Sequence, residues 1–142
     1  MTEPLRLDRA LFAVSGPDTG AFLQNLVTTD IDRLAGAPAI YGGLLSPQGK
    51  LIADFILWRR GEAILIDVAA KRADDLRRRL TMYRLRAKIE IGPIEADLGV
   101  FAGARASASL SALDPRLPAL GMRSIAPAEG AAGGQEPAAY KA

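Results

Sequence analysis

The residues that could do chemistry are limited, because the sequence contains neither cysteine nor histidine. Thiolate nucleophiles, disulfides, Cys-ligated iron–sulfur clusters, Ser-His-Asp triads and histidine metal sites are therefore excluded within these 142 residues. Any chemistry has to use carboxylates, Tyr, Lys, Arg, backbone groups or a bound cofactor. The carboxylate that stands out is Asp54, which interrupts the apolar run at residues 51–58.

Two interpretations of Asp54 are open. A carboxylate on a strand with apolar residues on both faces is costly to bury unless it meets a donor, a cation or a cleft. Asp54 could be a half-buried structural residue that accepts hydrogen bonds from backbone or from an arginine. It could instead be the polar anchor at the floor of a ligand pocket, where a few polar groups among apolar walls orient the ligand. The periodicity of the strand does not choose between them.

The element that positions Asp54 is predicted to be a β-hairpin. Two apolar runs, at residues 39–46 and 50–59, flank the turn sequence Pro-Gln-Gly-Lys, in which proline and glycine favour a tight reversal of the chain. A second tight turn leads to a further strand at residues 63–68. These three strands predict an antiparallel meander with Asp54 in its middle strand.

Two features near the hairpin bear on a possible pocket. The pair Gly42-Gly43 weakens the first arm, and such a pair is typical of a bulge or of a place where another group approaches the backbone closely. Several polar residues at the end of the first helix and just after it could also line a site, although we favour a cap-and-turn role for them. They are Gln24, Asn25, Thr28 and Asp30.

Two helices and further strands complete the expected α+β fold, an antiparallel meander sheet packed with two helices. Ser15 and Asp18 predict the start of a first helix that ends near Val27. A second helix over residues 70–85 carries one apolar stripe at helical spacing. Its arginines are not interleaved with a set of stacking aromatic residues, so we favour a solvated face over an RNA-binding one. The remaining strands are expected at residues 9–14, 87–91, 97–104 and 121–126.

Length and composition indicate one soluble domain. A chain of 142 residues with 49% hydrophobic and 24% charged residues can bury a real core. The formal charge of +2 does not by itself indicate a nucleic-acid or membrane partner. No run approaches the roughly 18 apolar residues of a membrane span, and the start lacks a signal-peptide pattern. We expect a cytoplasmic protein whose domain covers residues 1–126, with a loop or disordered tail at 127–142.

Several segments in collinear order between residues 7 and 126 together form a pattern. They are SGPD (15–18), FLQ (22–24), TTD (28–30), LSPQGKLIADF (45–55), YRLRAK (83–88), DPR (114–116) and LGMR (120–123). The set resembles the YgfZ family of folate-binding proteins, which are related to the aminomethyltransferase (T-protein) of the glycine cleavage system. The resemblance implies a fold of three domains around a central tetrahydrofolate site, and this chain would supply most of the first domain.

The resemblance also implies functions, and this sequence departs from both branches of the family. YgfZ-type members support the assembly or repair of iron–sulfur enzymes, whereas T-proteins transfer a one-carbon unit to tetrahydrofolate. The matching strand of T-proteins carries two adjacent acidic residues, one facing the reactive end of the folate; here the pair is Ala53-Asp54, which argues against methylene transfer. The Lys-Gly-Cys-x-x-Gly-Gln-Glu segment of the YgfZ branch needs a cysteine, and residues 133–136 echo only its end. We interpret the chain as a fragment or a truncated form.

The resulting prediction is a folate-binding, YgfZ-type accessory protein for iron–sulfur cluster assembly that binds no metal and acts with iron–sulfur client proteins. Asp54 would contact the folate and would be the catalytic residue if the domain were an enzyme. Tyr41 would form an aromatic wall and Arg86 a counter-charge for the glutamate tail, with ordinary core and surface roles as their alternatives. One rival is a tetrahydrofolate-dependent aminomethyltransferase. The other is a non-catalytic scaffold domain that self-associates through an exposed apolar face.

Overall fold

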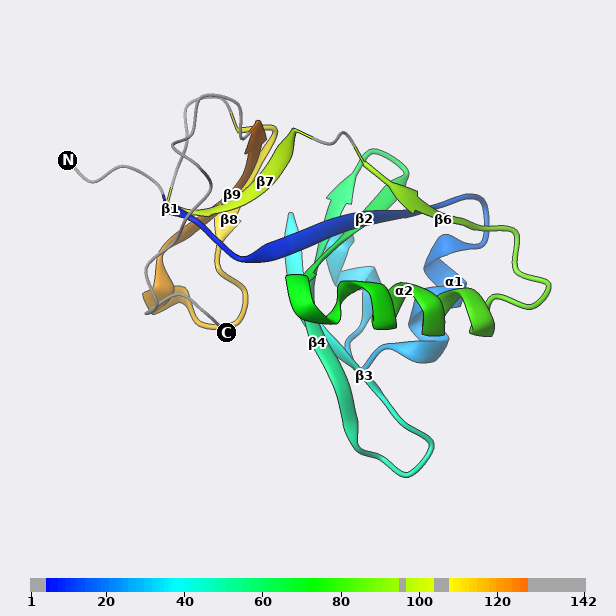
Figure 1. Cartoon of the computed structure of the whole chain (residues 1–142). Coiled ribbons are helices and arrows are strands. Elements are labelled where there is room, and N and C mark those ends of the chain that lie inside the picture. The colour runs from blue at the N-terminus through cyan, green and yellow to red at the C-terminus, as the bar shows by residue number, and fades with distance from the viewer. Residues whose placement is uncertain (1–4, 95–96, 104–107, 128–142) are drawn as a thin grey trace.

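The protein folds into two antiparallel sheets and two α-helices in a computed structural model, which describes residues 5–94, 97–103 and 108–127 (Figure 1). The larger sheet has five strands in the order β3 (Ala39–Leu45), β4 (Leu51–Arg60), β5 (Ala63–Ala69), β2 (Arg9–Ser15) and β6 (Glu90–Pro93). The smaller sheet has four strands in the order β1 (Leu5–Arg6), β7 (Leu98–Ala102), β9 (Met122–Pro127) and β8 (Leu110–Leu113). The predicted α+β class is confirmed.

The meander β3–β4–β5 forms as predicted. Gly49 in the first turn has φ +86° and Gly61 in the second has φ +60°, backbone conformations that glycine adopts without steric cost. The register places Tyr41 opposite Ile56 and Gly43 opposite Asp54. Strand β2, which precedes the meander in the sequence, pairs with the side of β5 that β4 leaves open. The hairpin β3–β4 extends away from the rest of the molecule (Figure 1).

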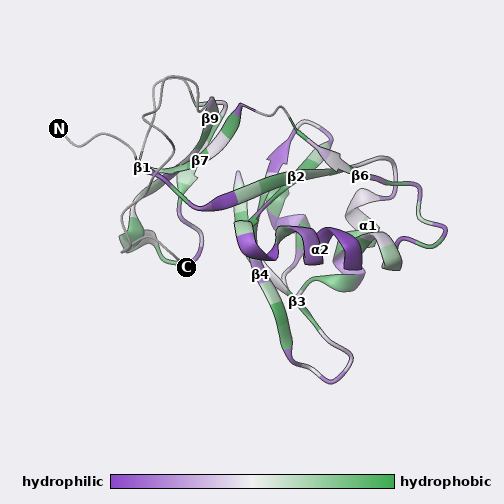
Figure 2. Ribbon diagram, viewed as in Figure 1, coloured by the Kyte–Doolittle hydropathy of each residue, from purple (hydrophilic) through white to green (hydrophobic). Residues whose placement is uncertain are grey.

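Two helices, α1 (Thr19–Leu26) and α2 (Ala70–Tyr83), bury the apolar residues of one sheet face. Leu23 of α1 and Leu76 and Leu80 of α2 are fully buried against Phe55 and Leu57 of β4. Hydrophilic residues occupy the outer side of α2 (Figure 2). The predicted start of α1 is corrected, because Ser15 belongs to β2. Instead the Asp18 carboxylate accepts a hydrogen bond from the Lys88 amide, which ties the start of α1 to the segment before β6.

The opposite face of the five-stranded sheet packs on the four-stranded sheet. Ile56 and Trp58 of β4 contact Val100 of β7 and Ile125 of β9 in a second apolar cluster, and all four are fully buried. This second core covers only the half of the hairpin that is next to β5. The outer half, towards the turn, therefore lies beyond the covering sheet.

Several strand boundaries differ from the prediction. The strand expected at residues 87–91 is β6, which begins later, at Glu90, and continues through Gly92 to Pro93. Proline is tolerated there because β6 is an edge strand. The strands β1 and β8 and the 3-10 helices η1 (Ile31–Ala35) and η2 (Pro118–Leu120) were not predicted. In the tail expected at 127–142, residue 127 ends β9 and residues 128–142 lie outside the described residues. Among the described residues, no helix is long and apolar enough to cross a membrane.

Candidate functional site

Asp54 lies on the exposed half of the hairpin, so it is not the half-buried carboxylate of the first of the two interpretations. Strand alternation puts it on the same face as Ile56 and Trp58, but the four-stranded sheet stops short of it, so Asp54 is exposed. Among the described residues, the one hydrogen bond to the Asp54 carboxylate comes from the Tyr41 hydroxyl, which donates to Oδ2 at 2.5 Å. Tyr41 is 39% exposed. The structure therefore brings together two of the three residues singled out in the sequence.

The hydrogen bond between these two residues changes the acidity of the phenol. The pKa of Tyr41 is raised above its usual value of 10.0, first because its hydrogen bond to Asp54 favours the neutral phenol, and then because of partial burial and the negative charge of Asp54. The positive charges of Arg116 and Arg9 oppose this shift. At neutral pH, Tyr41 is therefore a donor that orients the carboxylate.

A hollow of about 260 Å3 opens beside this pair, and we call it the hairpin hollow. Besides Tyr41 and Asp54 it is lined by Thr28, Thr29, Gly42, Gly43 and Leu51. The predicted close approach to the glycine pair is found, and the approaching group is Thr29. A Cβ atom on Gly42 would lie only 2.7 Å from Thr29 Cγ2. Glycine at this position lets the loop after α1 lie directly on β3.

Hydrogen bonds fix this loop along the edge of β3. The Gly43 amide donates to Thr28 Oγ1, and the Thr28 amide donates to the Gly43 carbonyl oxygen, both at 3.0 Å. The Gln24 side chain donates to the Thr29 carbonyl at 3.2 Å and accepts from the Ile31 amide at 2.8 Å. The favoured cap-and-turn role of Gln24 is confirmed. Thr28 and Thr29 line the hairpin hollow, a placement that sequence reasoning did not favour.

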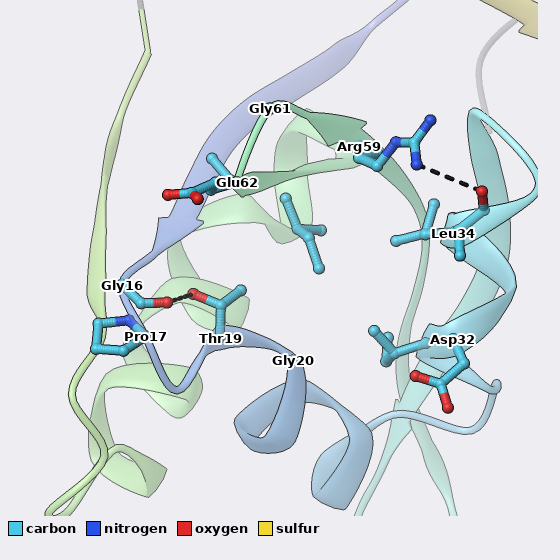
Figure 3. A pocket seen from close by; sticks show the side chains of 13 residues that line it. Gly16, Pro17, Thr19, Gly20, Asp32, Leu34, Arg59, Gly61 and Glu62 are labelled. Atoms are coloured by element: carbon cyan, nitrogen blue, oxygen red, sulfur yellow. Dashed lines mark hydrogen bonds between the residues drawn. The ribbon is translucent and has the colours of Figure 1, made fainter.

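The structure does not bring Arg86 to Asp54. Arg86 lines a separate hollow of about 290 Å3 between the end of α2 and the outer side of α1, with Phe22 and Tyr83 among its walls. None of the residues that line this hollow lines the hairpin hollow. A larger hollow of about 740 Å3, which the sequence did not predict, lies between the start of α1, η1 and the β4–β5 turn (Figure 3). Its polar walls mix Arg59 with the carboxylates of Asp32 and Glu62.

Sequence reasoning missed a buried carboxylate, Asp67 of β5, which is fully inaccessible to solvent. Arg9 Nε donates to its Oδ1 at 2.8 Å, and Arg123 donates to both carboxylate oxygens at 2.8 and 3.0 Å. The indole of Trp58 adds a hydrogen bond of 3.1 Å. Burial raises the pKa of Asp67, but the two arginines outweigh this effect and hold the pKa below its usual value of 3.8. Asp67 is therefore ionised and links β5 to the second sheet.

The buried pairs continue towards the surface. Arg123 Nη1 also donates to Asp114 Oδ2 at 3.2 Å. Asp114 in turn receives two hydrogen bonds from the Arg116 guanidinium, 2.9 Å from Nε and 2.7 Å from Nη2. We call the whole set the ion network: Arg9, Asp67, Arg123, Asp114 and Arg116. The signal for it was the same as for Asp54, an aspartate inside an apolar strand, in the run Ala-Ile-Leu-Ile-Asp-Val-Ala at 63–69.

Comparisons with known proteins find similarity to three kinds of relatives. No protein-family model matches the chain. An iron-sulfur cluster assembly factor IBA57 homolog, mitochondrial, from Pyricularia oryzae is 30% identical in an alignment of 139 positions that covers 85% of this chain and 34% of that protein. The tRNA-modifying protein YgfZ from Edwardsiella ictaluri is 38% identical in an alignment of 117 positions that covers 80% of this chain and 35% of that protein. An aminomethyltransferase from Rubrobacter xylanophilus is 39% identical in an alignment of 83 positions that covers 52% of this chain and 22% of that protein.

The fold is shared with a solved structure. The glycine cleavage system aminomethyltransferase T from Bartonella henselae superposes with a TM-score of 0.61 at 21% identity, covering 69% of this chain and 27% of that one. The fold and the sequence similarities thus define an aminomethyltransferase-like α+β domain. The chain belongs to the superfamily that unites the aminomethyltransferases with the YgfZ and IBA57 proteins. It spans only about a third of the length of relatives such as the Pyricularia and Edwardsiella proteins.

Proposed function

We propose that this domain binds a tetrahydrofolate at the hairpin hollow and serves iron–sulfur protein maturation. Membership of the superfamily supports folate as the ligand. The similarity to relatives that are named iron-sulfur cluster assembly factors supports maturation as the process. Iron–sulfur client proteins would be the partners, and the cytoplasm stays the predicted location; the names of the fungal relatives place those proteins in mitochondria.

The observation that carries the proposal is the exposed Asp54 carboxylate beside a hollow. Tyr41 occupies Oδ2 with one hydrogen bond, which leaves acceptor positions on the carboxylate for N–H groups of a ligand. Folate offers such donors on its pterin ring and its amines, and the exposed ring of Tyr41 offers an aromatic wall. The hollow of about 260 Å3 is smaller than the roughly 300–1,000 Å3 of pockets that enclose a ligand of drug size. The hairpin hollow would hold one part of the folate, with the rest lying along the surface around it.

A group of three or more metal-binding side chains is absent from the described part of the chain. The proposed role concerns what the chain's own residues do: Asp54 accepts from the ligand, Tyr41 orients that carboxylate, and the Thr28–Gly43 hydrogen bonds hold the wall of the hollow. The folate would supply any one-carbon group.

Aminomethyl transfer to tetrahydrofolate is the second candidate function, and it is supported by the position of Ala53, the residue that stands where T-proteins have the other acid. Ala53 is 6% exposed and faces the helices, whereas Asp54 on the next position faces the opposite way. Having alanine in place of an acid at position 53 therefore affects the core, and it leaves the carboxylate of the hairpin hollow in place. If this domain transfers the one-carbon unit, production of methylenetetrahydrofolate from an aminomethyl donor should disappear in Asp54→Asn.

Calorimetric titration of the chain with tetrahydrofolate and with formyltetrahydrofolate tests the main proposal. We expect saturable binding in the micromolar range, about −8 kcal/mol. Asp54→Ala should weaken binding by about 10-fold or more, because it removes a charged hydrogen-bond acceptor. The matched control is Asp75→Ala, which removes a carboxylate on the outer side of α2 and should leave binding unchanged. Absence of heat with both folates for the unmodified chain would contradict the proposal.

A scaffold role is the third candidate, supported by two groups of exposed leucines. They are Leu45 and Leu51 near the hairpin turn and Leu113, Leu117 and Leu120 around η2, each more than 40% exposed. If these residues bind a second copy of the chain, sedimentation velocity should show a shift with concentration. Leu51→Ser would then reduce the shift, whereas monomers at high concentration would exclude this role.

A further inference from the structure

We propose that Arg116 is the cation of the folate site and donates hydrogen bonds to a carboxylate of the bound ligand. The inference rests on the proposed folate binding and adds to it the residue that recognises the acidic end of the ligand. Arg116 thereby takes the role that was predicted for Arg86. Four features of the molecule support the assignment.

The first feature is the position of the ion network relative to Asp54. In the five-stranded sheet, Tyr41 lies opposite Ile56, and Ile56 lies opposite Asp67, so the three residues form one row across β3, β4 and β5. Residues in register point to the same face, and neighbouring strands are about 4.8 Å apart. Asp67 is thus roughly 10 Å from Tyr41 on the face that carries Asp54. Asp67, the buried end of the network, therefore lies on the same face of the sheet as the site.

The second feature is the charge of the network and where that charge is accessible. Three arginines (9, 116 and 123) and two aspartates (67 and 114) give 3 − 2 = +1. The side chains of Arg9 and Arg123 are only 7% and 2% exposed, whereas that of Arg116 is 29% exposed. An anion can therefore reach the surplus positive charge at Arg116 better than at either of the other two arginines.

The third feature is that Arg116 acts electrostatically on the hairpin hollow. The pKa of Arg116 is raised above its usual value, first by its hydrogen bonds to Asp114 and in smaller part by the charges of Asp67 and Asp54. Its own positive charge opposes the upward shift of the Tyr41 pKa. The guanidinium is thus close enough to the Tyr41–Asp54 pair for their charges to interact.

The fourth feature is that Arg116 is fixed in place and still has donors to offer. A guanidinium carries five N–H groups, and Arg116 uses Nε and Nη2 for Asp114. Within the described residues no acceptor is found for Nη1. Asp114 is itself only 3% exposed and is held by Arg123, so this pairing fixes the direction of the guanidinium before a ligand arrives.

These features match a ligand with donors at one end and a carboxylate at the other. Asp54 accepts hydrogen bonds, and the planar fork of Arg116 fits a carboxylate. Folate has N–H donors on its pterin part and two carboxylates on its glutamate. A pterin without the glutamate would satisfy Asp54 and leave Arg116 without a ligand partner. Arg116 therefore makes the site selective for folates over simple pterins.

Calorimetry with two ligands tests this role: tetrahydrofolate, and tetrahydrobiopterin, which lacks the aminobenzoyl-glutamate part. Arg116→Gln should raise the Kd for tetrahydrofolate by about 10-fold or more, since it removes a charge-assisted hydrogen bond. It should leave the Kd for tetrahydrobiopterin unchanged. Tetrahydrofolate binding by the unmodified chain should also weaken as salt is added, and by the variant much less. The matched control Arg86→Gln should behave as the unmodified chain with both ligands.

Other outcomes would overturn the assignment. Equal weakening of both ligands in Arg116→Gln would make Arg116 a structural residue. Unchanged tetrahydrofolate binding in Arg116→Gln would contradict the assignment, and so would an equal weakening in Arg86→Gln. If the unmodified chain binds neither ligand, the folate proposal itself fails, which is distinguishable from a bound ligand that ignores Arg116→Gln. Arg116→Lys keeps the charge without the fork and should weaken tetrahydrofolate binding by less than Arg116→Gln; circular dichroism checks that both variants are folded.

Discussion

Two aspartates on the same face of the five-stranded sheet have opposite environments. Asp67 of β5 is inaccessible to solvent and receives hydrogen bonds from Arg9, Arg123 and Trp58. Asp54 of the neighbouring strand β4 is exposed, with Tyr41 as its hydrogen-bond partner within the described residues. Both interrupt apolar strands, so the difference does not arise from local sequence. It arises from where the four-stranded sheet ends.

The covering sheet brings the donors that make a buried carboxylate possible. An ionised carboxylate buried without partners would cost several kcal/mol, and Asp67 is covered by the same strand, β9, that carries Arg123. Where the covering sheet stops, no such donors are needed and Asp54 faces solvent. Asp67 therefore holds the two sheets together, whereas we expect Asp54 to contribute little to folding.

The largest effect should come from Asp67→Asn. The substitution keeps the shape but leaves Arg9 and Arg123 buried beside an uncharged group, raising the charge of the ion network from +1 to +2. Breaking a buried ion pair in this way destabilises proteins by about 3–5 kcal/mol. Urea unfolding followed by the fluorescence of Trp58, the one tryptophan of the chain, measures the loss.

The same substitution at the other aspartate is the matched control. Asp54→Asn changes an exposed side chain and should alter the free energy of unfolding by no more than about 0.5 kcal/mol. Equal effects of the two substitutions would show instead that both carboxylates are structural.

Acid should weaken the ion network. The pKa values of Asp67 and Asp114 are both held below 3.8 in the folded protein, against the opposing effect of burial, by their arginine partners. The unfolded chain therefore binds protons first as pH falls. Stability from these groups is complete well above pH 3.8 and is lost as pH falls through their lower folded values, by about 1.4 kcal/mol per pH unit for each proton taken up.

Urea midpoints measured from neutral pH down to about pH 3 check this dependence. Asp114→Asn removes one titrating carboxyl of the ion network, so this variant should start less stable and lose less stability between about pH 5 and pH 3. A loss as steep as that of the unmodified chain would show that Asp114 is not held ionised by Arg116 and Arg123.

Local chemistry was enough to predict the five-stranded half of the molecule. The Pro-Gln-Gly-Lys turn, the alternation along β3–β5 and the apolar stripe of α2 are signals contained within a few residues, and the structure confirms the elements they predict. In the four-stranded sheet, the strands expected at residues 97–104 and 121–126 are found as β7 and β9, but β1 and β8, which have only two and four residues, were missed. Strands of that length carry too little periodicity to be read from sequence.

The candidate site was predictable only in part, because some of its contacts join residues that are far apart in the sequence. Tyr41 and Asp54 lie 13 positions apart on one hairpin, so their contact follows from its register. The contact between Arg123 and Asp67 joins residues 56 positions apart on different sheets. Arg116 is joined to that pair through Asp114. The sequence does not show how the two sheets pack on each other, so it gave no reason to prefer Arg116 over Arg86.

The smallest effect concerns the hydrogen bond between Tyr41 and Asp54 itself. This bond is the main cause of the raised pKa of Tyr41, so the phenol should ionise only above pH 10.0, and stability from the bond is present below that value and lost as pH rises past it. Phenolate absorbance during an alkaline titration, taken as the difference between the unmodified chain and Tyr41→Phe, isolates Tyr41 from the two other tyrosines.

Asp54→Asn should bring the pKa of Tyr41 back towards 10.0, because an amide removes both the charged acceptor and the negative charge that oppose ionisation. A Tyr41 pKa that does not respond to Asp54→Asn would mean that the phenol does not orient this carboxylate in solution. The Asp54 carboxylate would then have no hydrogen-bond partner among the described residues, whereas Asp67 is held by two arginines and Trp58. A response would show instead that the exposed carboxylate is already oriented before a ligand binds.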